Sequence, residues 1–203
     1  MIARVNILID GGFFMQKFRE QHRKFPNADD TVAEVERIME AVRKKSGGDC
    51  KDVLMRVYYY DCKPYGGKEK NPNDEEIDFS TTKFYLAREK ALRALAQKER
   101  FAVRLGELSF DGWDTVVKKT GGENTEYEYV PKLKQKGVDM KVGLDMALMA
   151  LKRTADKVVL VAGDSDFIAP MKFVRKEGMQ VYLYSMGHRV KSQLTEHCDF
   201  KLS

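Results

Sequence analysis

Short apolar runs alternate with longer amphipathic segments along the chain, and this alternation predicts strands and helices in turn. Strands are expected over residues 5–10, 53–61, 101–108, 157–162 and 180–185. Helices are expected over residues 13–24, 31–45, 80–100, 139–153, 167–177 and 192–197. The first run, VNILID, is almost wholly apolar, which is typical of a strand that is buried on both faces. Five strands separated by helices favour a mostly parallel α/β sheet.

Local signals support some boundaries of these elements, and two segments depart from the alternation. Thr31 and Glu34 are spaced as a capping box at the start of the second helix. Residues 62–78 are polar and are predicted to form a loop. Residues 111–137 fit the alternation least well, and two structures remain open for them: a hairpin that turns at Gly121-Gly122, or a substrate-facing insertion. The whole chain, 1–203, is otherwise expected to form one domain.

Composition indicates a soluble, highly charged globular protein. The apolar fraction is 43% and the charged fraction 33%, and no stretch approaches the ~20 apolar residues that span a membrane. The N-terminal apolar run lacks a basic leader and a cleavage site, so it is interpreted as a strand and not as a signal peptide. Cys50, Cys62 and Cys198 lack paired spacing, which favours reduced thiols in a cytoplasmic protein.

Carboxylates follow or precede the predicted strands at three places. Asp10 ends the first strand, Asp164 and Asp166 follow the fourth, and Asp139 and Asp145 lie on the helix before the fourth. Ligands of doubly wound sheets bind beyond the carboxyl ends of the strands, where the winding direction reverses. Carboxylates gathered there would raise one another's pKa unless a hard cation such as Mg²⁺ or Mn²⁺ were bound. The alternative for the Asp164 segment is an ordinary loop with a helix cap.

The two helical carboxylates are not equivalent. Asp139 and Asp145 are six residues apart, so their directions differ by ~120° on an ideal helix. Asp145 borders an apolar stripe, which predicts that it faces at least partly inward and needs a partner. The stripe consists of Leu144, Leu148 and Leu151. Asp139 stands at the helix start, where it either joins the acidic site or serves as a cap.

Three blocks of sequence resemble the NYN domain family of PIN-like ribonucleases, in its LabA-like branch. They are Ile9-Asp10-Gly11-Gly12, then Lys136-Gly137-Val138-Asp139 with Asp145 six residues on, then Ala162-Gly163-Asp164-Ser165-Asp166-Phe167. The order of the blocks and the spacing of the last two match the family. In layout the resemblance spans nearly the whole chain.

This resemblance implies a three-layer α/β sandwich of PIN-like, Rossmann-like topology, a Mg²⁺ or Mn²⁺ site, and hydrolysis of RNA by an endoribonuclease. The residues that match the family's catalytic and metal positions are Asp10, Asp145, Asp164 and Asp166, with Asp139 as a further metal residue. The chain departs from the family at Phe13, where many relatives have Asn. That departure weakens a contact next to the site.

The net charge of +5 permits a polyanionic partner. The lysines expected to bind nucleic acid precede or enter the acidic helix, and they are Lys132, Lys134, Lys136 and Lys141. Together with Trp113, Tyr127 and Tyr129 they could form a groove that tracks single-stranded RNA by charge and stacking. The alternative is a solvated lysine-rich loop. A homodimer is compatible with the sequence.

Two other enzyme classes also use an Asp-x-Asp that follows a strand. Haloacid-dehalogenase-like phosphatases place their Asp-x-Asp after the first strand, where this chain has Asp10-Gly-Gly. Toprim folds need a Glu at the first strand, which this chain lacks. A module of the same fold that binds RNA or protein with weak or no catalysis remains the alternative function.

Overall fold

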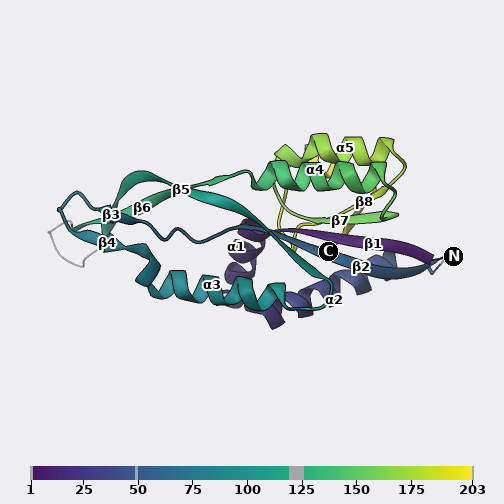
Figure 1. The fold of residues 1–203 in the computed structure, drawn as a ribbon. Coiled ribbons are helices and arrows are strands. Elements are labelled where there is room, and N and C mark those ends of the chain that lie inside the picture. The colour runs from purple at the N-terminus through teal and green to yellow at the C-terminus, as the bar shows by residue number, and fades with distance from the viewer. Residues whose placement is uncertain (1, 49, 119–125, 203) are drawn as a thin grey trace.

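The computed structural model describes residues 2–48, 50–118 and 126–202, and its centre is a seven-stranded sheet (Figure 1). The strands are β1 (Ile2–Asp10), β2 (Lys51–Cys62), β5 (Phe101–Lys118), β6 (Glu126–Lys136), β7 (Lys157–Val161), β8 (Gln180–Tyr184) and β9 (Phe200–Leu202). Their order across the sheet is β6-β5-β2-β1-β7-β8-β9. Neighbours are parallel, apart from the antiparallel pair β5–β6. The mostly parallel α/β sheet predicted from the sequence is confirmed.

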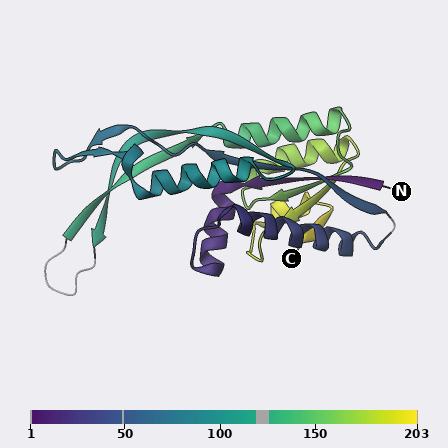
Figure 2. The ribbon, with the colours of Figure 1, turned by 60° about the horizontal axis from the view of Figure 1, so that its bottom comes forward.

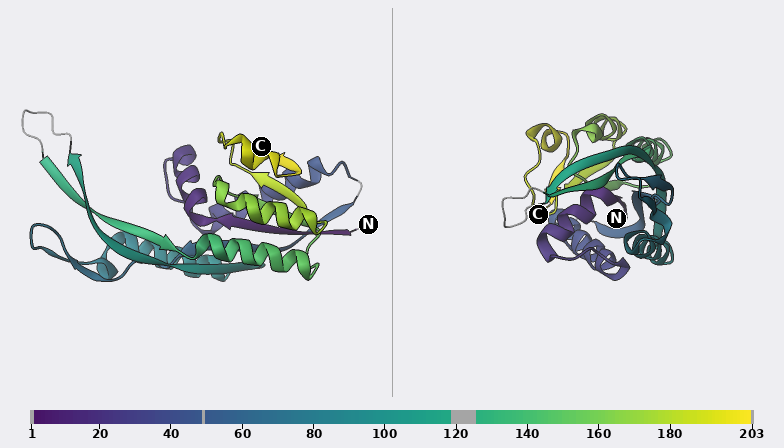
Figure 3. Two further views of the ribbon diagram at one scale, coloured as in Figure 1. Left: turned by 90° about the horizontal axis from the view of Figure 1, so that it is seen from above. Right: turned by 90° about the vertical axis from the view of Figure 1, so that its left-hand side faces the viewer.

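Helices cover both faces of the sheet and complete three layers (Figures 1 and 3). On one face lie α1 (Gly11–His22), α2 (Ala28–Lys45) and α3 (Lys83–Ala96); on the other lie α4 (Val138–Leu151), α5 (Ile168–Lys176) and α6 (Ser192–Glu196). Successive residues of β1 point to opposite faces of the sheet and so enter different cores. Ile7 packs with the first group of helices, and Leu8 packs with the second. None of the helices in the described part of the chain has the length and apolar content needed to cross a membrane.

The winding direction reverses between β1 and β7. From β1 the chain moves outward to β2 and β5, then returns to place β7 on the other side of β1 and continues to β8 and β9. Ile9 pairs with Val161 at the carboxyl ends of these two strands. Asp10 and the turn that carries Asp164 therefore follow at the switch point, where ligands of such sheets bind.

Some elements differ from the sequence prediction. The sheet has two strands beyond the five expected, β6 and β9, and the predicted loop 62–78 contains a small hairpin of β3 (Lys68–Lys70) and β4 (Glu76–Asp78). The capping box predicted at Thr31 was wrong. The box is formed by Asn27 and Asp30, because each side chain accepts the backbone N–H of the other at the first turn of α2.

Beyond the layered body, β5 and β6 continue as a long two-stranded ribbon, with the β3–β4 hairpin beside it (Figures 1 and 2). Rings from the ribbon and from the residues that flank the hairpin form a small core whose neighbouring centroids are 5.5 to 6.1 Å apart. They are Tyr65, Phe79, Phe110 and Trp113. The ribbon strands pair as the hairpin alternative for residues 111–137 predicts. The expected turn at Gly121-Gly122 lies outside the described residues.

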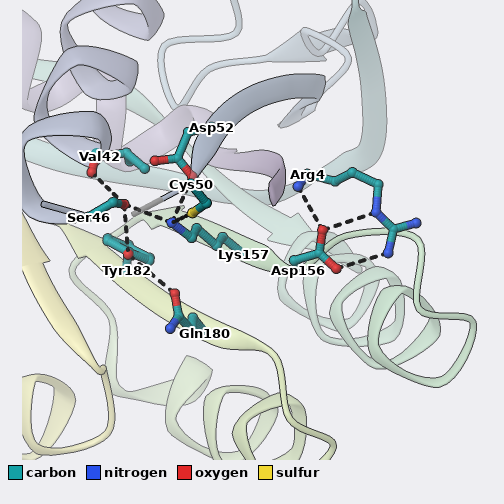
Figure 4. A network of polar contacts seen from close by, with 9 residues as sticks. All are labelled: Arg4, Val42, Ser46, Cys50, Asp52, Asp156, Lys157, Gln180 and Tyr182. Carbon is teal, nitrogen blue, oxygen red and sulfur yellow. Dashed lines mark hydrogen bonds and ion pairs between the residues drawn. The ribbon is translucent and has the colours of Figure 1, made fainter. Parts of the chain in front are cut away.

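At the opposite, amino-terminal edge of the strands, polar contacts join β1, β2 and β7 (Figure 4). The Lys157 ammonium lies 2.7 Å from the Asp52 carboxylate and donates to Ser46 Oγ at 2.7 Å, and the ion pair is buried. Nearby, Arg4 pairs with Asp156 at 3.0 Å, but these side chains are about two-fifths exposed. A buried and an exposed ion pair therefore stand at the same edge.

Candidate functional site

Asp10 is the last residue of β1 and caps α1. Its Oδ1 accepts the N–H of Gly12 at 3.0 Å and that of Phe13 at 3.2 Å. Burial raises the pKa of Asp10 to about 6, and the nearby Asp139 and Asp164 carboxylates contribute to the rise. The two N–H donors oppose this rise but do not cancel it. An ordinary cap would stabilise the charged form, but here burial outweighs the cap and the two neighbouring carboxylates add to its effect.

Two glycines allow the chain to pack closely around Asp10. A Cβ on Gly11 would lie 2.6 Å from the Tyr60 carbonyl oxygen, so β1 can turn directly into α1 only with glycine here. A Cβ on Gly163 would lie 2.5 Å from the Phe13 ring. Phe13, which stands where many relatives were expected to have Asn, therefore packs against the turn after β7.

Further carboxylates reach the same edge from two other elements. Asp164 follows β7 and accepts the N–H of Asp166 at 3.0 Å, which caps the short 3-10 turn Ser165–Phe167. Asp139 lies in the first turn of α4. Burial raises the pKa of Asp139, and Asp164 and Asp166 raise it further. Asp10, Asp139 and Asp164 are thus close enough to disfavour one another's charge, and Asp166 acts in the same way on Asp139.

Asp145 has different partners. Its Oδ2 accepts the Tyr60 hydroxyl at 2.9 Å and lies 3.2 Å from Arg104 Nε. Burial, and then the Asp145 carboxylate, raise the pKa of Tyr60. The partner expected for a half-buried Asp145 is therefore present, and it is a tyrosine–arginine pair from β2 and β5. Membership of Asp145 in the metal site stays a prediction.

The apolar stripe beside Asp145 was expected to face inward, and this was wrong. Leu144, Leu148 and Leu151 are 62%, 48% and 62% exposed. The core side of α4 consists of Val138, Val142, Met146, Met149 and Ala150. The helix is apolar on both sides, so periodicity could not decide which side is buried.

Three of the four lysines expected to bind nucleic acid already contact a carboxylate or a backbone carbonyl of this protein. Lys132 lies 3.6 Å from Asp114, and Lys134 lies 2.6 Å from Asp111, both on the ribbon. Lys141 donates to the Leu105 carbonyl at 2.6 Å. Tyr127 and Tyr129 occupy odd positions on β6, whereas Lys132, Lys134 and Lys136 occupy even positions, so they lie on opposite faces of the ribbon. The RNA-binding role of these lysines stays a prediction.

A cavity beside the acidic edge contains residues that the sequence did not single out. Its volume is about 490 Å³. Asp10 and Asp164 line it together with polar or basic side chains, namely Gln16, Lys17, His188, Arg189 and Lys191. The basic members come from α1 and from the loop after β8, and only the fold brings these segments together. Gln135 does not line the cavity but lies near it, because a Cβ on Gly12 would be 3.4 Å from the Gln135 amide nitrogen.

The donor chemistry of the acidic edge fits a hard divalent cation. Its carboxylates supply the oxygen ligands that Mg²⁺ and Mn²⁺ prefer, and a bound cation would favour the charged form of Asp10, which burial and the neighbouring carboxylates disfavour. Across the described residues, no three His, Cys, Asp or Glu side chains form a ready metal-binding group. Mg²⁺ is commonly held by one or two carboxylates together with water and substrate phosphate, so the residues fit this kind of binding.

A three-layer α/β molecule with carboxylates at the switch point of a parallel sheet has the features of the PIN-like nuclease fold. A family model described as the NYN domain matches residues 5–202, so the chain belongs to the NYN domain family. Members of this family are generally nucleases, which indicates a hydrolase acting on nucleic acid.

Comparison with solved structures supports the same fold. A crystal structure of a protein of unknown function from Vibrio parahaemolyticus superposes with a TM-score of 0.53 at 14% sequence identity, covering 98% of this chain and 91% of that chain. No curated protein sequence matches the chain.

Proposed function

We propose that the protein is a metal-dependent endoribonuclease that hydrolyses phosphodiester bonds of single-stranded RNA. One observation carries the proposal: Asp10 ends β1 and Asp164 follows β7 at the switch point between these strands, and both carboxylates line the same cavity. Carboxylates gathered where a parallel sheet binds its ligands supply the oxygen donors that a divalent cation needs.

Asp10, Asp139 and Asp164 would hold Mg²⁺ or Mn²⁺, with Asp166 beside them. A bound cation would lower the pKa of a water ligand and stabilise negative charge on the phosphodiester. The N–H groups of Gly12 and Phe13 fix the orientation of Asp10, and the N–H of Asp166 fixes that of Asp164. In the net reaction, water adds across a P–O bond and yields a phosphate monoester and a free hydroxyl.

A single strand is the preferred substrate, because its flexible backbone adapts to the carboxylates at the sheet edge and to the basic side chains beside them more easily than a rigid duplex does. The cytoplasm is the proposed compartment, where the free thiols of Cys50, Cys62 and Cys198 would stay reduced. The homodimer that the sequence allows stays a prediction, and sedimentation equilibrium tests it.

The test is a cleavage assay on metal-free protein with end-labelled single-stranded RNA, titrated with Mn²⁺ or Mg²⁺. Internal cleavage is expected to depend on the cation and to be lost in Asp10→Asn and Asp164→Asn. Asp74→Asn is the matched control, because the Asp74 carboxylate is 93% exposed and lies in the β3–β4 turn.

Binding of the same RNA, measured in parallel, separates the two candidate functions. An enzyme gives cation-dependent fragments that disappear in the two site variants. A binding module of the same fold gives affinity without fragments at any cation concentration, and that outcome would replace the proposal. Matched single-stranded DNA and duplex RNA test the preference for single-stranded RNA.

A further inference from the structure

The cavity beside Asp10 and Asp164 has the size and the charge pattern of a subsite for substrate. Its volume of about 490 Å³ lies within the range of ~300–1,000 Å³ found for ligand sites. Its lining includes the two carboxylates and also three cationic side chains, Lys17 from α1 and Arg189 and Lys191 from the loop after β8. A ligand in this space would meet both charges at once.

The positive charge of the cavity lining is only partly compensated. Lys17 lies 3.0 Å from Glu20, and the same carboxylate lies 3.7 Å from His188 Nε2. Within the described ranges, Arg189 and Lys191 take part in no ion pair, and both are exposed. Two cationic side chains are therefore available to an anion from solution.

Two of the ribbon lysines are less available to an anion than the cationic side chains of the cavity. Lys132 and Lys134 lie within ion-pair distance of Asp114 and Asp111, so a phosphate there would compete with a carboxylate that already partly neutralises each lysine. At the cavity no such exchange is needed for Arg189 or Lys191. The contrast favours the cavity as the place where the protein holds the backbone of its substrate.

We propose that Arg189 and Lys191, assisted by Lys17, bind a phosphate of the RNA strand that neighbours the one held at the acidic edge. The inference rests on the proposed function, since it assigns the path of that substrate. Arginine binds phosphate through two parallel N–H donors, and lysine binds it as a point charge. The phosphate is either an internal diester or a terminal monoester, since both present the negatively charged oxygens that arginine and lysine bind.

The proposal is tested by RNA binding in EDTA over a range of salt concentrations, with RNA integrity checked on gels. In the double variant Arg189→Gln/Lys191→Gln, the log–log salt slope is expected to become shallower by about 1.4, because each lost contact to single-stranded RNA accounts for ~0.7. The matched control Lys132→Gln/Lys134→Gln removes the same charge from the ribbon and is expected to change the slope less. The melting temperature of each variant checks folding.

A neutral methylphosphonate placed next to the cleavage position locates the contact. It should weaken binding to the wild type but cause no further loss in the Arg189→Gln/Lys191→Gln variant. RNAs with and without a terminal phosphate distinguish a terminal monoester from an internal diester. If the Arg189→Gln/Lys191→Gln variant keeps the wild-type salt slope while the wild type cleaves RNA, the subsite alone is overturned. If the variant has a reduced slope but the wild type cleaves no RNA, the subsite stands and the nuclease is overturned.

Discussion

At the scale of single residues, Asp10 combines two roles with opposite electrostatic demands. As the cap of α1 it accepts two backbone N–H groups, which favour the charged carboxylate. As a half-buried neighbour of Asp139 and Asp164 it is pushed toward the neutral form, and the second effect prevails in the metal-free protein. This conflict makes a stability test possible that is separate from catalysis.

In metal-free protein, Asp10→Asn is expected to be more stable than the wild type at about pH 7.5, by up to about 3 kcal/mol. Folding raises the pKa of Asp10 from 3.8 to about 6, so the folded state is favoured when the Asp10 carboxyl is protonated. This contribution to the free energy of unfolding is complete below the pKa of the unfolded chain and is lost as the pH rises through about 6. Asn keeps the cap without the charge. Urea unfolding at about pH 4 and about pH 7.5 measures the difference. An equal difference at both values would contradict the charge argument.

The two helical carboxylates are expected to respond differently to amide substitution. Asp139 is coupled to Asp164 and Asp166, whereas Asp145 pairs with Tyr60 and Arg104. Asp139→Asn should therefore reduce cation-dependent cleavage more strongly than Asp145→Asn, and Asp145→Asn should mainly lower the melting temperature. Initial rates at saturating Mn²⁺ measure the first effect. A larger loss of rate from Asp145→Asn would support the prediction that Asp145 belongs to the metal site.

Sequence could place Asp10 and Asp164, because a carboxylate directly after a buried strand must lie at the carboxyl edge. It could not decide between Asp139 and Asp145. Their ~120° separation shows that they point differently, but not which one faces the cluster. That choice depends on how α4 packs, which is a tertiary property.

At the scale of elements, α4 shows why helix periodicity was insufficient. Both its exposed side and its core side are rich in Leu, Met or Val, so the expected burial of Leu144 and its stripe was wrong. The five strands with clear apolar runs were predictable. β9 has only three residues, which is too short for a periodic pattern, and it forms by pairing with β8. The sequence alone therefore did not predict it.

The amino-terminal edge provides an element-scale prediction. Lys157→Met is expected to destabilise the protein by about 3–5 kcal/mol, because it leaves the Asp52 carboxylate buried without its ammonium partner. Arg4→Ala is the matched control at the same edge, where the exposed ion pair with Asp156 should contribute about 0–1 kcal/mol. Urea denaturation measures both. Equal losses would show that the Lys157 pair is not buried in solution.

At the scale of the whole molecule, the two edges of the sheet are specialised. Ion pairs lie at the amino-terminal edge of the strands (Figure 4). Asp10 and Asp164 lie at the carboxyl ends of β1 and β7, toward the side where the ribbon leaves the body (Figure 1). Lys17 and Arg189 are far apart in sequence and lie on a helix and a loop without a shared motif. The cavity that they line therefore could not be predicted from the sequence.

The most direct test of the central claim is a calorimetric titration of the metal-free protein with Mn²⁺. The wild type should show saturable binding, and a cation concentration of about 100 Kd should stabilise it by ~2.7 kcal/mol in a parallel thermal melt. Asp10→Asn/Asp164→Asn should lose both the binding and the stabilisation, whereas Asp74→Asn should keep them. Equal Mn²⁺ binding by the wild type and the double variant, or no binding by the wild type, would contradict the account.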